Sequence, residues 1–204
     1  MTDPVRLPDR SARREALMGA RREALLDAAD RAVRRDGPAT SMAAVAAAAG
    51  ITKPILYRHF GDKGGLVAAL AERHTGRLLA VLRDALARGR TRRERVELTI
   101  DAYLALIEAA PQLYRFLVRP EGALTPAQVR TFTRRLGDML ADGIAAELGV
   151  GASSPREQAW AHGIVGMVQT AADWWLDEQP CPREELAGRL ADLVLGGYAE
   201  DRPG

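Results

Sequence analysis

Apolar residues recur three and four positions apart along most of this 204-residue chain, and this helical spacing limits its fold more than any other feature. The first stripe predicts a helix over about 14–35, which Gly37-Pro38 would end. No stretch alternates between apolar and polar residues as a half-buried strand would. Ala, Leu and Arg, which are strong helix formers, supply much of the composition. The sequence therefore predicts an all-α fold of about nine helices.

Clear helix-start patterns divide the second half of the chain. Thr125-Pro126 and Ser154-Pro155 both fit a capping box, with proline at the first helical position. Pro182 is followed by two acidic residues within the first turn of another helix. Together with the apolar stripes, these patterns predict helices at about 65–87, 94–109, 111–118, 126–148, 155–178 and 183–199.

Residues 41–63, SMAAVAAAAGITKPILYRHFGDK, predict two short helices joined by a tight turn. Ser41 can cap the first helix, and Gly50 supplies the turn. Thr52 can cap the second helix, where Pro54 lies in the first turn and its missing N–H costs nothing. The outer face of this second helix would carry Thr52, Lys53, Tyr57 and His59. This arrangement is that of a helix-turn-helix, whose second helix enters the major groove of DNA.

The segment Gly-Ile-Thr-Lys-Pro-x-Leu-Tyr-x-His-Phe at 50–60, with Lys63 and Leu66 after it, resembles the tetracycline-repressor (TetR) family of one-component regulators. The resemblance covers about 14–72. It implies a DNA-binding domain at 16–64 and a ligand-binding and dimerisation domain at 65–201. Residues 1–15, with two prolines, four arginines and no sustained periodicity, are expected to form a flexible basic arm. The implied partners are double-stranded operator DNA with an inverted repeat, a small-molecule effector and a second copy of the chain. No cofactor, metal ion or membrane partner is expected.

The resemblance also implies roles for single residues. Ser41, with Thr40 beside it, would bind a phosphate, and Tyr57, His59 and Lys63 would do the same. Thr52, Lys53 and Pro54 would face base edges or the adjacent backbone, with Lys53 the best candidate for contacting guanine. Ile55 either touches a thymine methyl group or packs inside. The arm residues Arg6, Arg10 and Arg13 either reach the minor groove or remain in solvent.

The helices after residue 65 are expected to enclose a ligand pocket. Its predicted lining is Tyr103, Ile107, Phe116, Phe132, Met139, Met167 and Trp174. The polar groups expected inside are few, which favours an apolar or amphipathic ligand: Tyr103, His162, Gln169, Thr170 and Asp173.

In the family, the last two long helices pair with their copies to form a dimer, and here these would be 155–178 and 183–199. Trp174 and Trp175 cannot face the same way, so one of them faces the partner or the pocket. A charge at Leu190 is expected to abolish operator binding through loss of the dimer.

Charge and composition narrow the function classes. Residues 1–63 hold 12 basic and 8 acidic residues, which favours a polyanionic partner for this end of the chain. The histidines are far apart, Cys181 is the only cysteine, and there is no phosphate-cradling glycine loop or nucleophile elbow, so an enzyme is disfavoured. No apolar run approaches the roughly 20 residues of a membrane span, and a cytoplasmic location is expected.

Repression released by a ligand is the expected mode of regulation. An activator and a ligand-independent regulator remain open, as does a helical small-molecule-binding protein that has lost DNA binding. The intact polar face at Lys53, Tyr57, His59 and Lys63 argues against the last of these.

Overall fold

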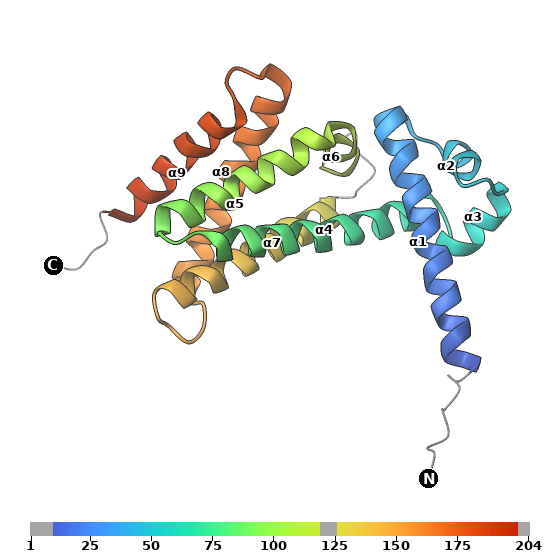
Figure 1. Cartoon of the computed structure of the whole chain (residues 1–204), viewed down its shortest axis with the longest axis horizontal. Coiled ribbons are helices and arrows are strands. Elements are labelled where there is room, and N and C mark those ends of the chain that lie inside the picture. Colours follow the sequence, from blue (N-terminus) through green and yellow to red (C-terminus); the bar gives the residue numbers. More distant parts are fainter. Residues whose placement is uncertain (1–9, 119–125, 200–204) are drawn as a thin grey trace, which may run out of the picture.

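The computed structural model describes residues 10–118 and 126–199, and all regular secondary structure within them is helical (Figure 1). The helices are α1 (Arg10–Asp36), α2 (Met42–Ala48), α3 (Lys53–Phe60), α4 (Lys63–Arg88), α5 (Arg92–Ala109), α6 (Pro111–Val118), α7 (Pro126–Glu147), α8 (Pro155–Glu178) and α9 (Arg183–Ala199), with a 3-10 turn at Gly37–Ala39. The all-α prediction is confirmed. None of the described helices is long and apolar enough to cross a membrane.

Several predicted helix starts have the expected caps. The Ser41 hydroxyl accepts a hydrogen bond from Ala44 N at 3.2 Å. Ser154 and Glu157 form the predicted capping box, in which Ser154 N donates to the Glu157 carboxylate at 2.7 Å. Thr125, the cap of the other predicted capping box, lies outside the described residues. The agreement shows that these starts are encoded locally.

The N-terminal boundary differs from the expectation. Helix α1 begins at Arg10, so the last part of the predicted arm at 1–15 is helical, while Arg6 lies outside the described residues. Figure 1 shows the first turns of α1 projecting away from the other helices. Arg13 lies on this projecting part and is exposed. The extra turns fit the sequence, because Arg, Glu, Ala, Leu and Met at 13–18 are all good helix formers.

Two hydrophobic cores divide the molecule. The first joins α1, α2, α3 and the start of α4, with Val33, Val45, Leu56 and Leu70 among its most buried side chains. The second joins the end of α4 to α5, α7, α8 and α9 around the buried Trp175. Helix α4 runs unbroken through both cores, so it connects the two halves mechanically.

Helix α6 also belongs to both cores. Its Leu113 and Phe116 pack with α1–α4, whereas Tyr114 packs with α5 and α8. The first core therefore extends beyond residue 64, the predicted end of the DNA-binding domain, to include Leu66 and α6. Since α6 touches both cores, a displacement in the second core can reach the first through α6 as well as through α4.

Candidate functional site

The α2–turn–α3 unit has the geometry of a helix-turn-helix. Gly50 adopts φ +64°, a left-handed conformation that favours glycine, and Ile51 N donates to Ala46 O at 3.0 Å across the turn. Leu56 and Phe60, four residues apart, anchor α3 in the first core. The opposite face of α3 is therefore held towards solvent.

Most of the predicted DNA-contacting residues lie at this surface. Thr52, Lys53, Pro54 and Tyr57 are exposed on α3 and its cap, and the Thr52 hydroxyl makes no capping hydrogen bond. His59 is half-buried beside them, while Ser41 and Lys63 are exposed at the starts of α2 and α4.

Thr40 differs from the rest of the predicted set. Its side chain is buried, and its hydroxyl donates to Gly37 O at 2.6 Å. The hydroxyl closes the 3-10 turn before α2, so it faces the protein interior and not a phosphate. We therefore exclude Thr40 from the candidate DNA-contacting residues.

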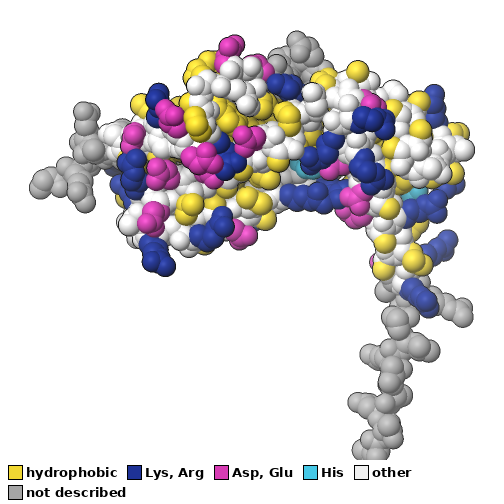
Figure 2. Space-filling view, turned by 45° about the horizontal axis from the view of Figure 1, so that its top comes forward, with side chains coloured by type: hydrophobic (Ala, Val, Ile, Leu, Met, Phe, Trp, Pro, Cys, Tyr) yellow, Lys and Arg dark blue, Asp and Glu magenta, His cyan; other side chains and the backbone are white. Residues whose placement is uncertain are grey.

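Basic residues of α1 extend this surface, and the sequence patterns did not point to them. Partial burial lowers the pKa of His59, and the nearby charges of Arg21, Arg58 and Arg22 lower it further. The Arg22 guanidinium also lies 4.9 Å from the centre of the Phe60 ring. In Figure 2, Lys and Arg side chains gather over the N-terminal helices and along the projecting part of α1. The position of α1 beside α3 depends on tertiary packing, which the periodicity of apolar residues along the chain does not predict.

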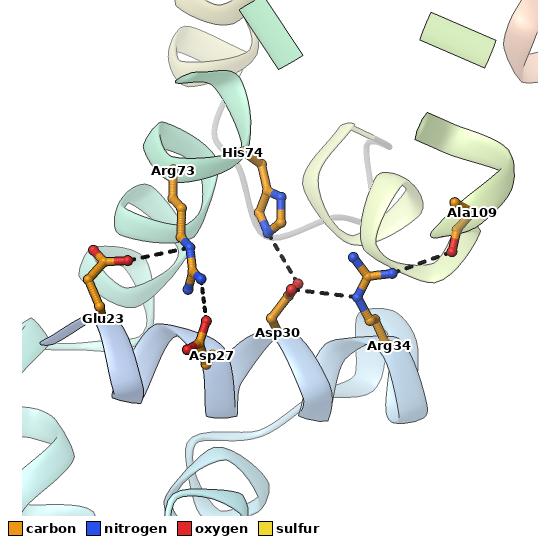
Figure 3. A network of polar contacts seen from close by, with 7 residues as sticks. All are labelled: Glu23, Asp27, Asp30, Arg34, Arg73, His74 and Ala109. Atoms are coloured by element: carbon orange, nitrogen blue, oxygen red, sulfur yellow. Dashed lines mark hydrogen bonds and ion pairs between the residues drawn. The ribbon is translucent and has the colours of Figure 1, made fainter. Parts of the chain in front are cut away.

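A polar network attaches this DNA-facing unit to α4 (Figure 3). Arg73 of α4 pairs with Asp27 and, at 3.5 Å, with Glu23 of α1. The His74 ring lies 3.1 Å from Asp30, which Arg34 also approaches at 3.5 Å. Burial acts to raise the pKa of Asp30, but His74 and Arg34 together hold it below its usual value. The α1 helix is thus tied to the middle of α4 by several charged groups.

A cavity of about 300 Å³ lies in the second half of the molecule between α5, α7 and α8. Its wall is mainly apolar and includes Leu82, Leu86, Val96, Ile100, Leu136, Met139, Leu140, Ile144, Ile164, Val165, Val168 and Val194. Arg92, Arg95 and Glu147 border it where α5 begins and α7 ends, with Arg95 and Glu147 paired at 2.6 Å. Its polar residues further along α5 and α8 are Thr99, Tyr103 and Gln169.

The structure divides the predicted pocket residues. Tyr103 and Met139 line the cavity. Ile107, Phe132 and Met167 pack in or against the second core without lining it, and Phe116 belongs to the first core. The exposed fraction of Trp174 is 52%, so this residue lies at the surface. Helical spacing predicts which residues face inward, but it does not distinguish the cavity wall from the first or the second hydrophobic core.

The predicted polar lining divides in the same way. Gln169 lines the cavity with Tyr103, and one oxygen of Asp173 is buried. His162 and Thr170 are exposed on α8, and the Thr170 hydroxyl donates to Gly166 O at 2.9 Å. The interior is therefore less polar than the sequence suggested.

The two adjacent tryptophans of α8 face opposite ways, as expected. Trp175 is 2% exposed, and its indole N–H donates to Cys181 O at 2.9 Å. Trp174 continues an exposed stripe on α8 that includes Gly163, Gly166 and Thr170. On α9, Leu193 is 63% exposed, whereas Leu190 is 4% exposed inside the protomer. We name the exposed residues Gly163, Gly166, Thr170 and Trp174 of α8 and Leu193 of α9 together the α8–α9 face.

Comparison with known families decides the identity of the chain. Residues 25–70 match the model of bacterial regulatory proteins of the tetR family, and residues 81–204 match that of the tetracyclin repressor-like C-terminal domain. The chain belongs to the TetR family. It is a transcriptional regulator of this family, and family members bind operator DNA and ligands as dimers.

Curated relatives agree with this TetR assignment. The chain is 30% identical over 198 residues to the HTH-type transcriptional activator FasR of Mycolicibacterium smegmatis, covering 95% of this chain and 86% of FasR. It is 31% identical over 177 residues to an uncharacterised HTH-type transcriptional regulator of Mycobacterium tuberculosis, covering 85% of this chain and 75% of that protein.

Solved structures share the TetR fold. A tetR-family regulator from Streptomyces coelicolor has a TM-score of 0.74 at 22% identity, covering 90% of this chain and 85% of that one. FadR from Bacillus subtilis, solved in complex with stearoyl-CoA, has a TM-score of 0.66 at 16% identity, covering 86% and 98%.

The position of His59 leads to a pH prediction for this TetR regulator. Its pKa in the free protein lies below the ordinary 6.5, so the ring is mostly neutral at pH 7. A phosphate beside the ring would raise the pKa in the complex, and binding would then take up a proton. Operator affinity is therefore expected to increase as the pH falls from about 7.5 towards about 6 at constant salt.

The matched variants are His59→Gln and His74→Gln, assayed by titrating labelled operator across this pH range. The first should flatten the pH dependence, and the second should preserve it, because the His74 ring contacts Asp30 of α1 and is not one of the proposed DNA contacts. An unchanged pH dependence in His59→Gln would remove His59 from the phosphate contacts.

Proposed function

We propose that this TetR-family regulator is a repressor that binds an inverted-repeat operator as a dimer and is released by an elongated amphipathic ligand. The observation that carries the proposal is the solvent-facing polar side of α3, with Thr52, Lys53 and Tyr57 exposed beside the basic residues of α1. Its place of action would be the cytoplasm, where the operator is.

Each exposed residue then has a distinct role. Lys53 and Thr52 contact base edges near the start of α3, with Pro54 beside them. The phosphates on both sides of the major groove are bound by Tyr57, His59, Ser41 and Lys63. Arg21 and Arg22 of α1 bind phosphates as well. Phosphate contacts orient α3, and base contacts select the operator.

The cavity supports an amphipathic effector with an apolar body and an anionic head. Its long wall is apolar, which suits a hydrocarbon chain. Where α5 begins, Arg92 and Arg95 border the cavity and approach the Glu147 carboxylate at 4.0 and 2.6 Å, and such guanidinium groups can donate hydrogen bonds to an acidic head. The FadR neighbour, which shares the fold, was solved with stearoyl-CoA, a ligand of this general type. An acyl chain with an acidic head is therefore the first effector class to test.

Helix α4 offers a direct route from effector to operator. Its Leu82 and Leu86 line the cavity, while Arg73 and His74 on the same helix hold α1. A ligand that wedges between α5, α7 and α8 would displace α4 and with it the DNA-facing unit. Operator binding requires the two α3 helices of a dimer to be about 34 Å apart, so this displacement would favour a conformer that binds DNA poorly.

An activator is the second candidate, because the relative FasR is named a transcriptional activator. Both candidates use the same operator contacts, and they differ in what the bound dimer does to RNA polymerase. Transcription in vitro from a promoter carrying the operator separates them. Repression predicts less transcript with added protein and recovery with ligand, whereas activation predicts more transcript.

The first experiment is selection of binding sites from random duplex DNA, followed by a salt titration on the enriched sequence. An enriched inverted repeat whose affinity falls steeply with salt is the expected result. Absence of enrichment, with only weak non-specific binding, would contradict the operator-binding proposal.

Removal of single phosphate contacts should have measurable and uniform effects. Tyr57→Phe or Lys63→Ala is expected to weaken binding roughly 10- to 30-fold on all DNA sequences, since each dimer loses two contacts of about 1 kcal/mol each. Lys63→Ala should also reduce the salt slope. Arg134→Ala is the matched control, because this exposed arginine of α7 carries the same charge away from α3. Equal losses in Lys63→Ala and Arg134→Ala would indicate an effect of net charge alone.

A further inference from the structure

Next to the cavity, α5, α6 and α8 carry buried polar side chains, of which Tyr103 lines the cavity wall. Tyr103 of α5, Tyr114 of α6 and Asp173 of α8 each have a buried oxygen without a hydrogen-bond partner among the described residues: Tyr103 Oη, Tyr114 Oη and Asp173 Oδ1. An unpaired buried polar atom costs about 1–3 kcal/mol. These oxygens lie near enough to one another and to Gln169 to interact, but none of the three forms a hydrogen bond of good geometry.

The three groups influence one another electrostatically. Burial raises the pKa of Tyr103 to about 12, and the Asp173 carboxylate adds to the rise, while Tyr114 and Gln169 partly offset it. Burial also raises the pKa of Tyr114 well above its usual range, with Tyr103 and Asp173 contributing to the shift. Both hydroxyls therefore stay protonated at neutral pH and can donate hydrogen bonds.

Tyr103 brings this group to the cavity. Its side chain is 4% exposed and lines the cavity together with Gln169. Arg92 and Arg95, which border the cavity where α5 begins, lie on the same face of α5, and the 11 positions from Arg92 to Tyr103 correspond to about 16 Å of helix. A ligand lying along α5 with its anionic head at the arginines would thus place the far end of a chain of roughly a dozen carbons beside Tyr103.

We propose that Tyr103 and Gln169 form a subsite that binds a neutral hydroxyl group at the far end of the effector's apolar chain. This inference rests on the proposed function, in that the ligand is a chain with an acidic head at Arg92 and Arg95. The Tyr103 hydroxyl donates a hydrogen bond to the ligand oxygen, and the Gln169 side-chain oxygen accepts one from the ligand's hydroxyl. Asp173, behind them, disfavours a second carboxylate at this end through charge repulsion. A plain methyl end would leave Tyr103 Oη without a hydrogen-bond partner.

The test compares dodecanoic, ω-hydroxydodecanoic and dodecanedioic acids by calorimetric titration into the full-length protein without DNA. The hydroxy acid is expected to bind at least about tenfold more tightly than either of the others, because only it satisfies the subsite without adding charge. Tyr103→Phe should abolish this preference while leaving the affinity for dodecanoic acid within about threefold. Gln169→Leu should reduce the preference in the same direction.

Thr99→Val is the matched control. Thr99 also lines the cavity, but its hydroxyl already donates to Arg95 O at 2.7 Å, so the preference should survive this substitution. Thermal unfolding of the ligand-free proteins checks their folding, and Tyr103→Phe should be at least as stable as the parent, since it removes an unsatisfied hydroxyl.

The outcomes separate the two proposals. Equal binding of dodecanoic and hydroxydodecanoic acids, or a preference that persists in Tyr103→Phe, would overturn the hydroxyl subsite and leave the amphipathic effector in place. Tighter binding of the diacid would overturn the role of Asp173 and with it the neutral-hydroxyl assignment. Failure of all three acids to bind would overturn both the subsite and the acyl-type effector.

Discussion

Trp174→Glu combined with Leu193→Glu is expected to convert the protein into a monomer and to weaken operator binding by about 10²–10⁴-fold. Trp174 is 52% exposed and Leu193 63% exposed in the single chain, where each would present a large apolar side chain to water. On α8, Trp174 accompanies Gly163 and Gly166, where an added Cβ would meet nothing within 4 Å. A second copy of the chain is the occupant that TetR-family dimers place on such a surface.

The size of the effect follows from the symmetry of the dimer. In a two-fold dimer every substitution is present twice, and burial of one large apolar side chain contributes about 1.5–3 kcal/mol. Each substitution therefore removes about 3–6 kcal/mol from dimer formation, before any cost of burying the new carboxylates. A monomer would hold only one half-site, and it would lose the benefit of the linked second site.

Sedimentation velocity and operator titration at the same protein concentration check this prediction. Leu98→Glu is the matched control, because Leu98 lies on α5 and is 37% exposed outside the α8–α9 face. It should remain dimeric and bind normally. A monomeric double variant that binds the operator with unchanged affinity would contradict the requirement for a dimer.

From the sequence alone, Leu190 was expected to be the interface residue of α9, and this expectation is wrong. Leu190 has the apolar spacing of an interface position, but it is 4% exposed within the protomer and packs in the second core. A charge at Leu190 would destabilise the fold of each chain, so loss of DNA binding would reveal nothing about the dimer. Periodicity marks the apolar side of α9, whereas the boundary between the protomer's own core and its partner depends on how α9 is rotated against α5.

Local chemistry explains why so much of the fold was predictable. The Ser41 cap and the Ser154–Glu157 capping box are decided by residues within one turn, and Gly50 has the left-handed conformation that the turn requires. Because these features depend on neighbouring residues alone, the sequence predicts where the helices start. Helix α4 starts at Lys63, two residues before the expected start, because Asp62 caps it by accepting from Gly65 N at 2.7 Å.

The parts that sequence reasoning missed all depend on tertiary packing. Phe116 was expected in the ligand pocket, but α6 turns it towards the first core. Thr40 was expected at a phosphate, yet its hydroxyl closes the turn before α2. Arg21 and Arg22 were not singled out, because their approach to His59 requires α1 to cross beside α3. In each case the residue type is compatible with the expected and with the observed surroundings, and only the three-dimensional structure distinguishes the two.

Gly65→Ala is expected to lower the free energy of unfolding by about 2–3 kcal/mol and to weaken operator binding more than tenfold. A Cβ at Gly65 would lie 2.0 Å from Phe60 O, a backbone atom that cannot rotate away as a side chain can. Phe60 and Leu56 are anchored in the first core, so α3 must move as a unit or the start of α4 must unwind. Either response displaces Tyr57 and His59 relative to Lys63, and these are the proposed phosphate contacts.

Gly64→Ala is the matched control one residue earlier in the same helix. Its Cβ would lie 3.2 Å from Asp62 Oδ1, a side-chain atom that can shift by a few tenths of an ångström. Alanine is favoured over glycine in a helix by about 0.5–1 kcal/mol, so this variant should be as stable as the parent or slightly more stable. Urea unfolding at a fixed protein concentration, followed by circular dichroism, measures both variants against the parent.

The adjacent glycines make this comparison a test of the α3–α4 junction itself. By sequence alone Gly64 and Gly65 are equivalent first-turn residues, and helix propensity predicts the same small gain from alanine at both. The structure predicts opposite signs, because only Gly65 is approached by the last carbonyl of α3. Similar stability of the two variants would mean that α3 does not cross the start of α4 as described, and the proposed phosphate contacts of Tyr57, His59 and Lys63 would lose their common geometric basis.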